Sequence, residues 1–202
     1  MSAPSFAELE AAASSVIGIL QAMPEFSNAK IAVIGGLGLW KYLRGYRTTE
    51  DVDFLITVQG APSAVKDKLL AMPSGPFHQQ AQLFFYKSPN GKHIQIDITP
   101  DWQSPYLPSA AVSIYTVRPG SLPYISEIDL LVFKINSCGL RPTPAKKLRD
   151  ATDARSLADN LNSRGPIVLS STQKRAVLQG LDDVVRLSGK DLTWWKTKLA
   201  LS

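Results

Sequence analysis

Four short apolar runs in the first half of the chain have the length and the residue types of β-strands. Residues Lys30–Ile34 are continuous and β-branched, which predicts a buried strand. Residues 51–58 begin as an alternation of polar and apolar positions and continue as an apolar run. Residues 83–87 and 92–99 are joined by Ser-Pro-Asn-Gly, which predicts a β-hairpin. A fifth strand is predicted at residues 113–117, within a loop-rich stretch interrupted by prolines.

Helix-period patterns flank these strands and fill the last third of the chain. A capping box at Ser5 and Glu8 predicts a first helix that ends near Met23. Apolar positions at helical spacing predict further helices at residues 37–43, 128–135 and 192–195. Thr143-Pro144 starts a predicted helix that runs to about Asn162, and Ser170 or Ser171 caps another that runs to Gly189. The expected fold is α+β, with a core in residues 1–122 and a helical C-terminal subdomain in residues 123–202 that together form one compact unit.

Gly35 and Gly36 stand where the first buried strand gives way to a helix. Glycine lets the backbone approach a ligand closely, and the N–H groups at a helix N-terminus favour phosphate. A Gly-Gly pair after a strand is by itself more often an ordinary loop, so its interpretation depends on the residues that follow.

Three aspartates supply the carboxylates that a metal-bound phosphate needs. Asp51 and Asp53 are two positions apart on one strand and therefore point to the same face. Asp97 lies in a strand whose isoleucines point to the opposite face, so its carboxylate needs a partner or a metal. Mg²⁺ prefers oxygen ligands, and two-metal phosphoryl chemistry uses several carboxylates. The three residues predict a site for Mg²⁺ or Mn²⁺.

The order of these residues resembles the DNA polymerase β-type nucleotidyltransferase superfamily. The pattern is Gly-Gly, about ten residues, then Arg-x-Thr-x-Asp-hydrophobic-Asp from Arg47 to Asp53, then one Asp on a later strand. Within that superfamily it is most similar to the small stand-alone branch of AbiEii-type toxin and of aminoglycoside and lincosamide nucleotidyltransferases. The resemblance covers roughly residues 25–160 and implies a mixed β-sheet flanked by helices.

The resemblance also implies a role for each matching residue. Gly35 and Gly36 become the triphosphate-binding turn, and Asp51 and Asp53 become ligands of both metals. Asp97 becomes the third ligand and the base that deprotonates the attacking hydroxyl. The implied nucleotide-binding set is completed by Arg47, Thr49, Lys134 and Asp150.

Two of these residues lie in predicted helices. In the related proteins a helical lysine and a later Lys/Arg-Asp-x-x-Asp element complete the site. By that resemblance Lys134 neutralises triphosphate charge, and Asp150 positions the substrate or a basic side chain.

Other interpretations of these residues are weaker. The segment Gly36-x-Gly38 is the start of a dinucleotide fingerprint, but Lys41 stands where a third Gly or Ala is needed. Asp51 and Asp53 come too early, and as a pair, to be the ribose-binding acid of that motif. The two histidines, His78 and His93, lack a metal-ligand spacing and are expected to face solvent or to form local hydrogen bonds.

Charge and composition bear on the partner. Lysine and arginine total 22 against 17 aspartates and glutamates, which gives a net charge of +5 and a pI near 9.3. Setting aside the three predicted metal ligands leaves 14 acidic residues, so the remaining surface is basic. An anionic acceptor such as RNA is therefore one expectation, although no stacking aromatic motif of the RNA-recognition type is present. The single cysteine, Cys138, excludes an internal disulfide and favours a reducing, cytoplasmic location, and no membrane partner is expected.

Together these features predict a Mg-dependent nucleotidyltransferase. It would transfer a nucleoside monophosphate from a nucleoside triphosphate to a hydroxyl of RNA such as tRNA, of a protein or of a small molecule. One alternative is a catalytically inactive nucleotide- or RNA-binding module with the same fold, although a degenerate site would be free to lose its aspartates. Another is one half of a protein pair whose helical C-terminus docks its partner.

Overall fold

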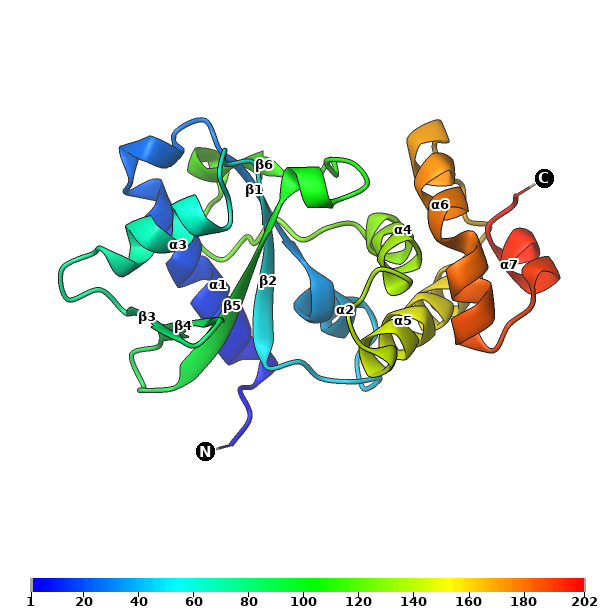
Figure 1. Cartoon of the computed structure of the whole chain (residues 1–202), viewed down its shortest axis with the longest axis horizontal. Helices are drawn as coiled ribbons and strands as arrows, with labels where there is room; N and C mark the ends of the chain where they lie inside the picture. Colours follow the sequence, from blue (N-terminus) through cyan, green and yellow to red (C-terminus); the bar gives the residue numbers. More distant parts are fainter. Residues whose placement is uncertain (1, 202) are drawn as a thin grey trace. The chain divides into compact units, whose positions relative to one another are not determined.

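A computed structural model describes residues 2–201 of the 202-residue chain and has the predicted α+β class. The chain divides into two compact units, Met1–Ile125 and Ser126–Ser202, which we call the α/β unit and the helical unit (Figure 1). The α/β unit holds the β-sheet, and the helical unit consists of helices and the turns that join them.

A six-stranded mixed sheet forms the centre of the α/β unit. Its strand order is β3-β4-β5-β2-β1-β6. The strands are β1 (Lys30–Ile34), β2 (Asp51–Ile56), β3 (Phe77–Gln80), β4 (Leu83–Lys87), β5 (His93–Pro100) and β6 (Val112–Ser113). Only the β2–β5 pair is parallel, and the other neighbours are antiparallel. The predicted hairpin is the β4–β5 pair.

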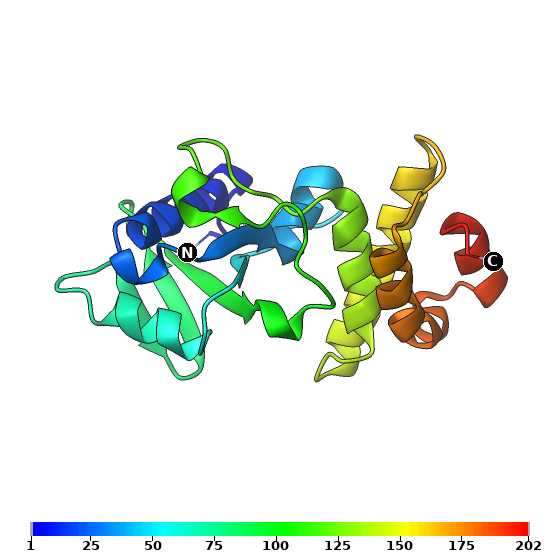
Figure 2. The same ribbon diagram turned by 90° about the horizontal axis from the view of Figure 1, so that it is seen from above.

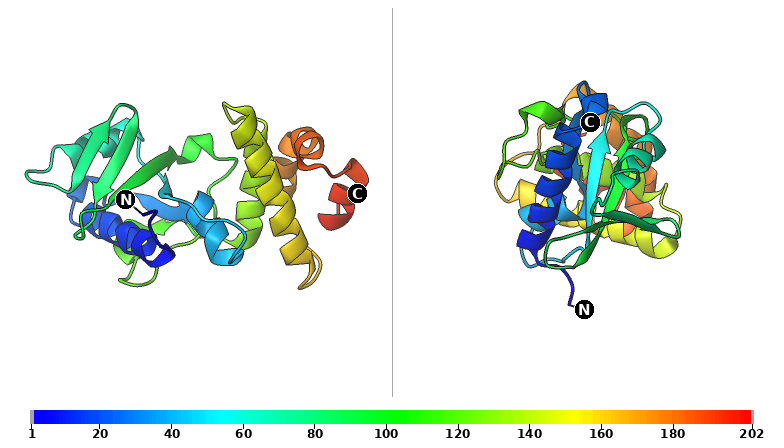
Figure 3. Two further views of the ribbon diagram at one scale, coloured as in Figure 1. Left: turned by 90° about the horizontal axis from the view of Figure 1, so that it is seen from below. Right: turned by 90° about the vertical axis from the view of Figure 1, so that its left-hand side faces the viewer.

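Helix α1 (Phe6–Gln21) lies along one face of this sheet (Figure 3). Its predicted capping box is present, since Ser5 Oγ accepts from the Glu8 N–H and the Glu8 carboxylate accepts from the Ser5 N–H. The buried side of α1 and the apolar side of the sheet belong to one hydrophobic core, which includes Val52, Phe54 and Ile96. This packing leaves the polar positions of β2 and β5 on the opposite side, which we call the open face.

Two further helices complete the α/β unit. Helix α2 (Gly35–Tyr42) begins directly after β1, as the glycine pair predicts. Helix α3 (Ser63–Leu70) follows β2 and packs its Val65 and Leu69 into the core. The sequence did not predict α3 or β3, because neither has a strong cap or a clear apolar alternation.

The predicted strand at residues 113–117 is wrong. Only Val112 and Ser113 pair with β1, and Ile114–Thr116 then form a 3-10 turn. The side-chain amide of Gln21 on α1 donates to the carbonyls of Ile114 and Val117, each at 2.8 Å. These bonds hold the chain in the turn, and a pattern read within residues 113–117 cannot reveal a partner on α1.

Helices α4 (Glu127–Cys138), α5 (Pro144–Asn162), α6 (Ser171–Ser188) and α7 (Leu192–Lys198) make up the helical unit (Figure 2). Their apolar positions form its core, with Trp195 fully buried and its ring N–H donating to Ser188 Oγ at 3.0 Å. Thr143 caps α5, and Ser170, one of the two predicted candidates, caps α6. Within residues 2–201, no helix is both long enough and apolar enough to span a membrane.

Candidate metal and nucleotide site

The three predicted aspartates meet on the open face of the α/β unit. Strands β2 and β5 pair in parallel with Asp53 opposite Asp97 and Asp51 opposite Gln95. One carboxylate oxygen from each of Asp51, Asp53 and Asp97 lies within 4.8 Å of the other two, and all three residues are half-buried. Residues far apart in the sequence are thus brought to one point by a single pair of strands.

Neighbouring polar groups orient these carboxylates. The Thr49 hydroxyl donates to Asp51, and the Gly36 N–H donates to Asp53 Oδ2 at 3.1 Å. The Gln95 amide donates to both oxygens of Asp97 at 3.0 Å each. The carboxylate oxygens are therefore held in place from the loop before β2, from the start of α2 and from β5.

The glycine pair packs directly against this cluster. Gly35 has φ +65°, a conformation that side chains rarely adopt, and a Cβ there would overlap the Asp53 carboxylate. A Cβ at Gly36 would lie only 2.8 Å from Thr49 Cβ. Both positions need glycine so that the N-terminus of α2 can lie against the aspartates.

The donor set fits a hard divalent cation. Three carboxylates at this spacing repel one another, and a cation that they share offsets the repulsion. Mg²⁺ binds through one or two carboxylates together with substrate phosphates, and Mn²⁺ accepts the same oxygen ligands. Asp51, Asp53 and Asp97 are the residues that can hold such an ion.

Arg47 and Thr49 precede β2 in the loop that follows α2. Arg47 is half-buried, and its guanidinium donates to the Thr48 carbonyl at 3.2 Å. Thr49 contributes through its bond to Asp51. Contact of either residue with a nucleotide stays a prediction.

Lys134 and Asp150 belong to the helical unit and form a buried ion pair there. Lys134 Nζ lies 2.5 Å from Asp150 Oδ1 and 3.0 Å from Asp153 Oδ2, and Arg141 also pairs with Asp150. Burial alone raises the pKa of Asp150, but the charges of Lys134 and Arg141 and their hydrogen bonds bring that pKa below its usual value. Asp150 thus pairs with two basic side chains, and a contact of Asp150 or Lys134 with a nucleotide stays a prediction.

Gln95 was not singled out by the sequence. Its place on the polar side of β5 follows from the alternation of that strand, but its contact with Asp97 and its position opposite Asp51 depend on the pairing of β5 with β2. The expectation for His78 and His93 was likewise incomplete, because their rings contact each other with centroids 4.5 Å apart. Since β3 was not predicted, no local pattern indicated that the ring of His78 would meet that of His93 on β5.

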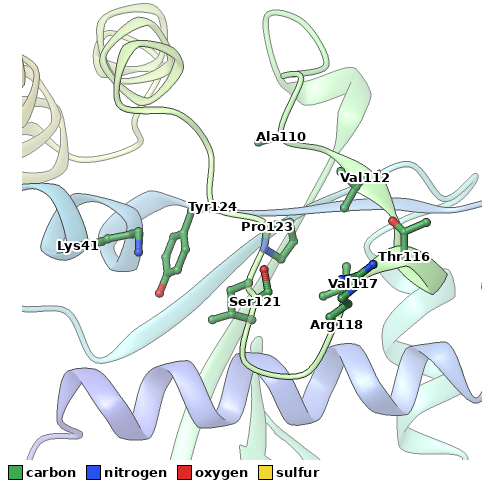
Figure 4. Close-up of a pocket in the computed structure, with 10 residues that line it drawn as sticks. Lys41, Ala110, Val112, Thr116, Val117, Arg118, Ser121, Pro123 and Tyr124 are labelled. Atoms are coloured by element: carbon green, nitrogen blue, oxygen red, sulfur yellow. The ribbon is translucent and has the colours of Figure 1, made fainter.

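A separate cavity of about 560 Å³ lies elsewhere in the α/β unit (Figure 4). Lys41, Arg118, Ser121 and Tyr124 are among its lining residues, and Lys41 Nζ lies 4.5 Å from the centre of the Tyr124 ring. Burial raises the pKa of Tyr124, as does the hydrogen bond of its hydroxyl to Glu10 at 2.8 Å. None of the three aspartates lines this cavity. The candidate site is therefore identified by its cluster of carboxylates and not by a cavity.

The sequence matches no protein-family model and no curated protein sequence. Among solved structures, the chain is similar to an antigenic nucleotidyltransferase-like protein from Paracoccidioides brasiliensis, with 18% identity and a TM-score of 0.57 over 95% of this chain and 94% of that one. A second similar structure is the antibiotic-resistance factor ANT(2'')-Ia, with 13% identity and a TM-score of 0.41 over 87% of this chain and 95% of that one. The chain therefore shares its fold with a nucleotidyltransferase-like protein, which agrees with the fold that the resemblance predicted.

Proposed function

We propose that the protein is a Mg²⁺- or Mn²⁺-dependent nucleotidyltransferase that moves a nucleoside monophosphate from a nucleoside triphosphate to a hydroxyl acceptor. The observation that carries this proposal is the convergence of Asp51, Asp53 and Asp97 within 4.8 Å, beside a glycine turn at a helix N-terminus. The nucleotidyltransferase-like fold supports the same class of reaction.

The glycines and the aspartates at the open face have different roles. The turn at Gly35 and Gly36 binds the phosphates, because the backbone there is close to Asp53 and the N-terminus of α2 favours negative charge. Asp51, Asp53 and Asp97 hold the divalent cation. A bound Mg²⁺ or Mn²⁺ supplies charge stabilisation for the transferring phosphoryl group and lowers the pKa of the acceptor hydroxyl.

The reaction forms one bond and breaks one. The acceptor oxygen attacks the α-phosphorus, and the bond from that phosphorus to the bridging oxygen breaks, so that pyrophosphate leaves with the electron pair. The proton of the acceptor hydroxyl passes to a carboxylate oxygen of Asp97, which the Gln95 amide holds in position. The side chains otherwise act by positioning, which is the main protein contribution in phosphoryl transfer.

The basic residues of the helical unit support an anionic partner. Residues 126–202 contain 13 lysines and arginines against eight aspartates and glutamates, whereas residues 1–125 contain nine of each. The net positive charge of the chain therefore comes from the helical unit, which favours encounter with a polyanion such as RNA. A protein partner on the same unit and a cytoplasmic location are further parts of this proposal.

The test is transfer of label from each of the four α-³²P nucleoside triphosphates, with Mg²⁺ or Mn²⁺, to total RNA, to the protein itself and to an aminoglycoside. We expect one of these acceptors to become labelled by the parent protein and not by Asp53→Asn. Asp67→Asn is the matched control, because Asp67 is an exposed carboxylate on α3 of the same unit, and it should transfer label like the parent.

The pattern of labelled lanes identifies the acceptor class. Labelled RNA identifies a polynucleotide transferase and its base preference, whereas label in the protein or drug lane assigns the acceptor there. No label in any lane, together with intact triphosphate binding, would contradict transfer and support the nucleotide-binding module instead.

A further inference from the structure

Three ring side chains share the open face with the aspartates. They are His78 on β3, Phe85 on β4 and His93 on β5, and we call them the ring platform. The His78 and Phe85 rings stack with centroids 5.2 Å apart and an interplanar angle of 15°, and the His78 and His93 rings meet edge to face at 4.5 Å. His78 and Phe85 are half-buried and His93 is exposed, so the platform lies at the surface of the sheet.

Strand register joins this platform to the aspartate cluster. His78 lies opposite Phe85, Phe85 lies opposite Gln95, and Gln95 lies opposite Asp51. Directly opposite residues point to the same side of a sheet, so these four positions form one continuous row across β3, β4, β5 and β2. Since neighbouring strands are about 4.8 Å apart, Phe85 lies about 10 Å along the sheet from Asp51, within reach of one extended ligand.

The platform lies on the side of the aspartates from which the acceptor must come. The glycine turn that would bind the phosphates directly follows β1, on one side of β2, whereas the platform extends from β5, on the other side. In an in-line displacement the attacking oxygen and the leaving pyrophosphate lie on opposite sides of the phosphorus. This in-line geometry, which rests on the proposed function, places the acceptor over β5 and β4.

The chemistry of the platform fits nucleobases. Bases of single-stranded nucleic acids stack on aromatic side chains and on histidine, largely without regard to sequence. Partial burial lowers the pKa of His78, and the neighbouring His93 and Lys87 add to this effect, so its ring is neutral at neutral pH. Lys87 is exposed and lies opposite His93, where its charge favours a backbone phosphate.

We propose that His78, Phe85 and His93 stack the bases of a single-stranded polynucleotide acceptor while its terminal hydroxyl lies at the aspartate cluster. An aminosugar acceptor offers no flat π-face to these rings and carries the same charge as Lys87. The acceptor class that this surface fits is therefore a polynucleotide with an unpaired end.

Direct binding tests this proposal without any requirement for transfer. The probes are fluorescein-labelled octamers of riboadenylate and of deoxyadenylate, titrated with the full chain in the absence of nucleoside triphosphate and followed by anisotropy. We expect Phe85→Ala and His78→Ala to weaken binding by about tenfold or more, because each removes a stacking ring. Phe85→Trp should keep the affinity, and Phe85→Leu should lose it although its apolar volume is similar.

Tyr115→Ala is the matched control. Tyr115 is an exposed aromatic residue that follows β6, at the opposite edge of the sheet from β3, and its loss should leave the affinity unchanged. Circular dichroism melts of each variant exclude a folding defect as the cause of lost binding. Tighter binding of one octamer shows whether the site prefers ribose or deoxyribose. Binding of either octamer that weakens when a ring is removed supports the proposal.

The proposal is overturned if the parent binds neither octamer, or if Phe85→Leu and His78→Ala bind as tightly as the parent. Failure of the proposed function has a different signature. In that case no acceptor is labelled in the transfer assay, while the octamers still bind through the ring platform.

Discussion

Each compact unit gathers carboxylates, but the surroundings of the two clusters differ. In the helical unit, Asp150 and Asp153 are buried and meet the ammonium of Lys134 inside the protein. In the α/β unit, Asp51 and Asp97 are half-buried on an open face and accept hydrogen bonds from a hydroxyl and an amide. The first arrangement compensates negative charge within the fold, and the second orients negative charge at the surface.

This difference separates a structural role from a chemical one. Carboxylates that are buried with a lysine stay charged because the lysine compensates them, and removal of either partner leaves an uncompensated charge. Carboxylates that neutral donors orient on an open face keep their charge available for a cation from solution. The two clusters should therefore respond in opposite ways to the same kind of substitution.

The largest expected effect is on catalysis and comes from the open cluster. Asp97→Asn should lower the transfer rate by about 10³-fold, since it removes the proposed base and a cation ligand. The melting temperature should change little, because the residue is half-buried and asparagine has the same shape. Initial rates and melts of one preparation measure both effects, and a large drop in stability with an unchanged rate would reverse the assignment.

The largest expected effect on stability comes from the buried cluster. Lys134→Met should destabilise the helical unit by about 3–5 kcal/mol, because it leaves Asp150 and Asp153 buried without the lysine charge. Urea unfolding followed by the helical circular dichroism signal measures this change. Destabilisation below about 1 kcal/mol, together with a raised KM for the nucleoside triphosphate, would instead support the predicted contact of Lys134 with phosphate.

A pair of glycine substitutions separates backbone strain from site geometry. Gly35 and Gly45 both have positive φ, so Gly35→Ala and Gly45→Ala should each cost about 1–3 kcal/mol of stability. Only a Cβ at Gly35 overlaps Asp53, whereas a Cβ at Gly45 meets no atom within 4 Å. Transfer should therefore be lost in Gly35→Ala and kept in Gly45→Ala, and equal rates for the two variants would contradict this account of the turn.

The smallest expected effect is a dependence of stability on pH that arises in the helical unit. Lys134 and Arg141 hold the folded-state pKa of Asp150 below its unfolded value of about 3.9. The contribution of this pair is therefore present above about pH 4 and is lost as the pH falls toward the folded-state pKa. The difference in unfolding free energy between the parent and Asp150→Asn should shrink from pH 6 to pH 3. A difference that grew over this range would show that folding raises the pKa of Asp150.

The sequence predicted those elements whose signals are local. The capping box at Ser5 and Glu8 is present as expected, and the strands that carry the three aspartates have the expected faces. The strand predicted at residues 113–117 failed because its conformation depends on Gln21, more than 90 positions away. Local sequence patterns predict helix caps and the two faces of a strand, but they do not predict which distant side chain stabilises a turn.

The candidate site shows the same limit. The aspartates could be selected from spacing and face, and the glycine pair from its place after a strand. The contact of Gln95 with Asp97, the pairing of Lys134 with two carboxylates and the ring platform all depend on register or on helix packing. These features required the tertiary structure because no fixed sequence spacing produces them.

Binding of a metal-nucleotide complex by the open aspartate cluster can be measured by isothermal titration with the α,β-methylene analogues of ATP, GTP, CTP and UTP, first with Mg²⁺ and then with EDTA. We expect binding of at least one analogue that requires Mg²⁺, disappears in Asp51→Asn and in Asp53→Asn, and is unchanged in Asp67→Asn. Equal binding with EDTA, or equal binding by the parent and Asp53→Asn, would contradict it.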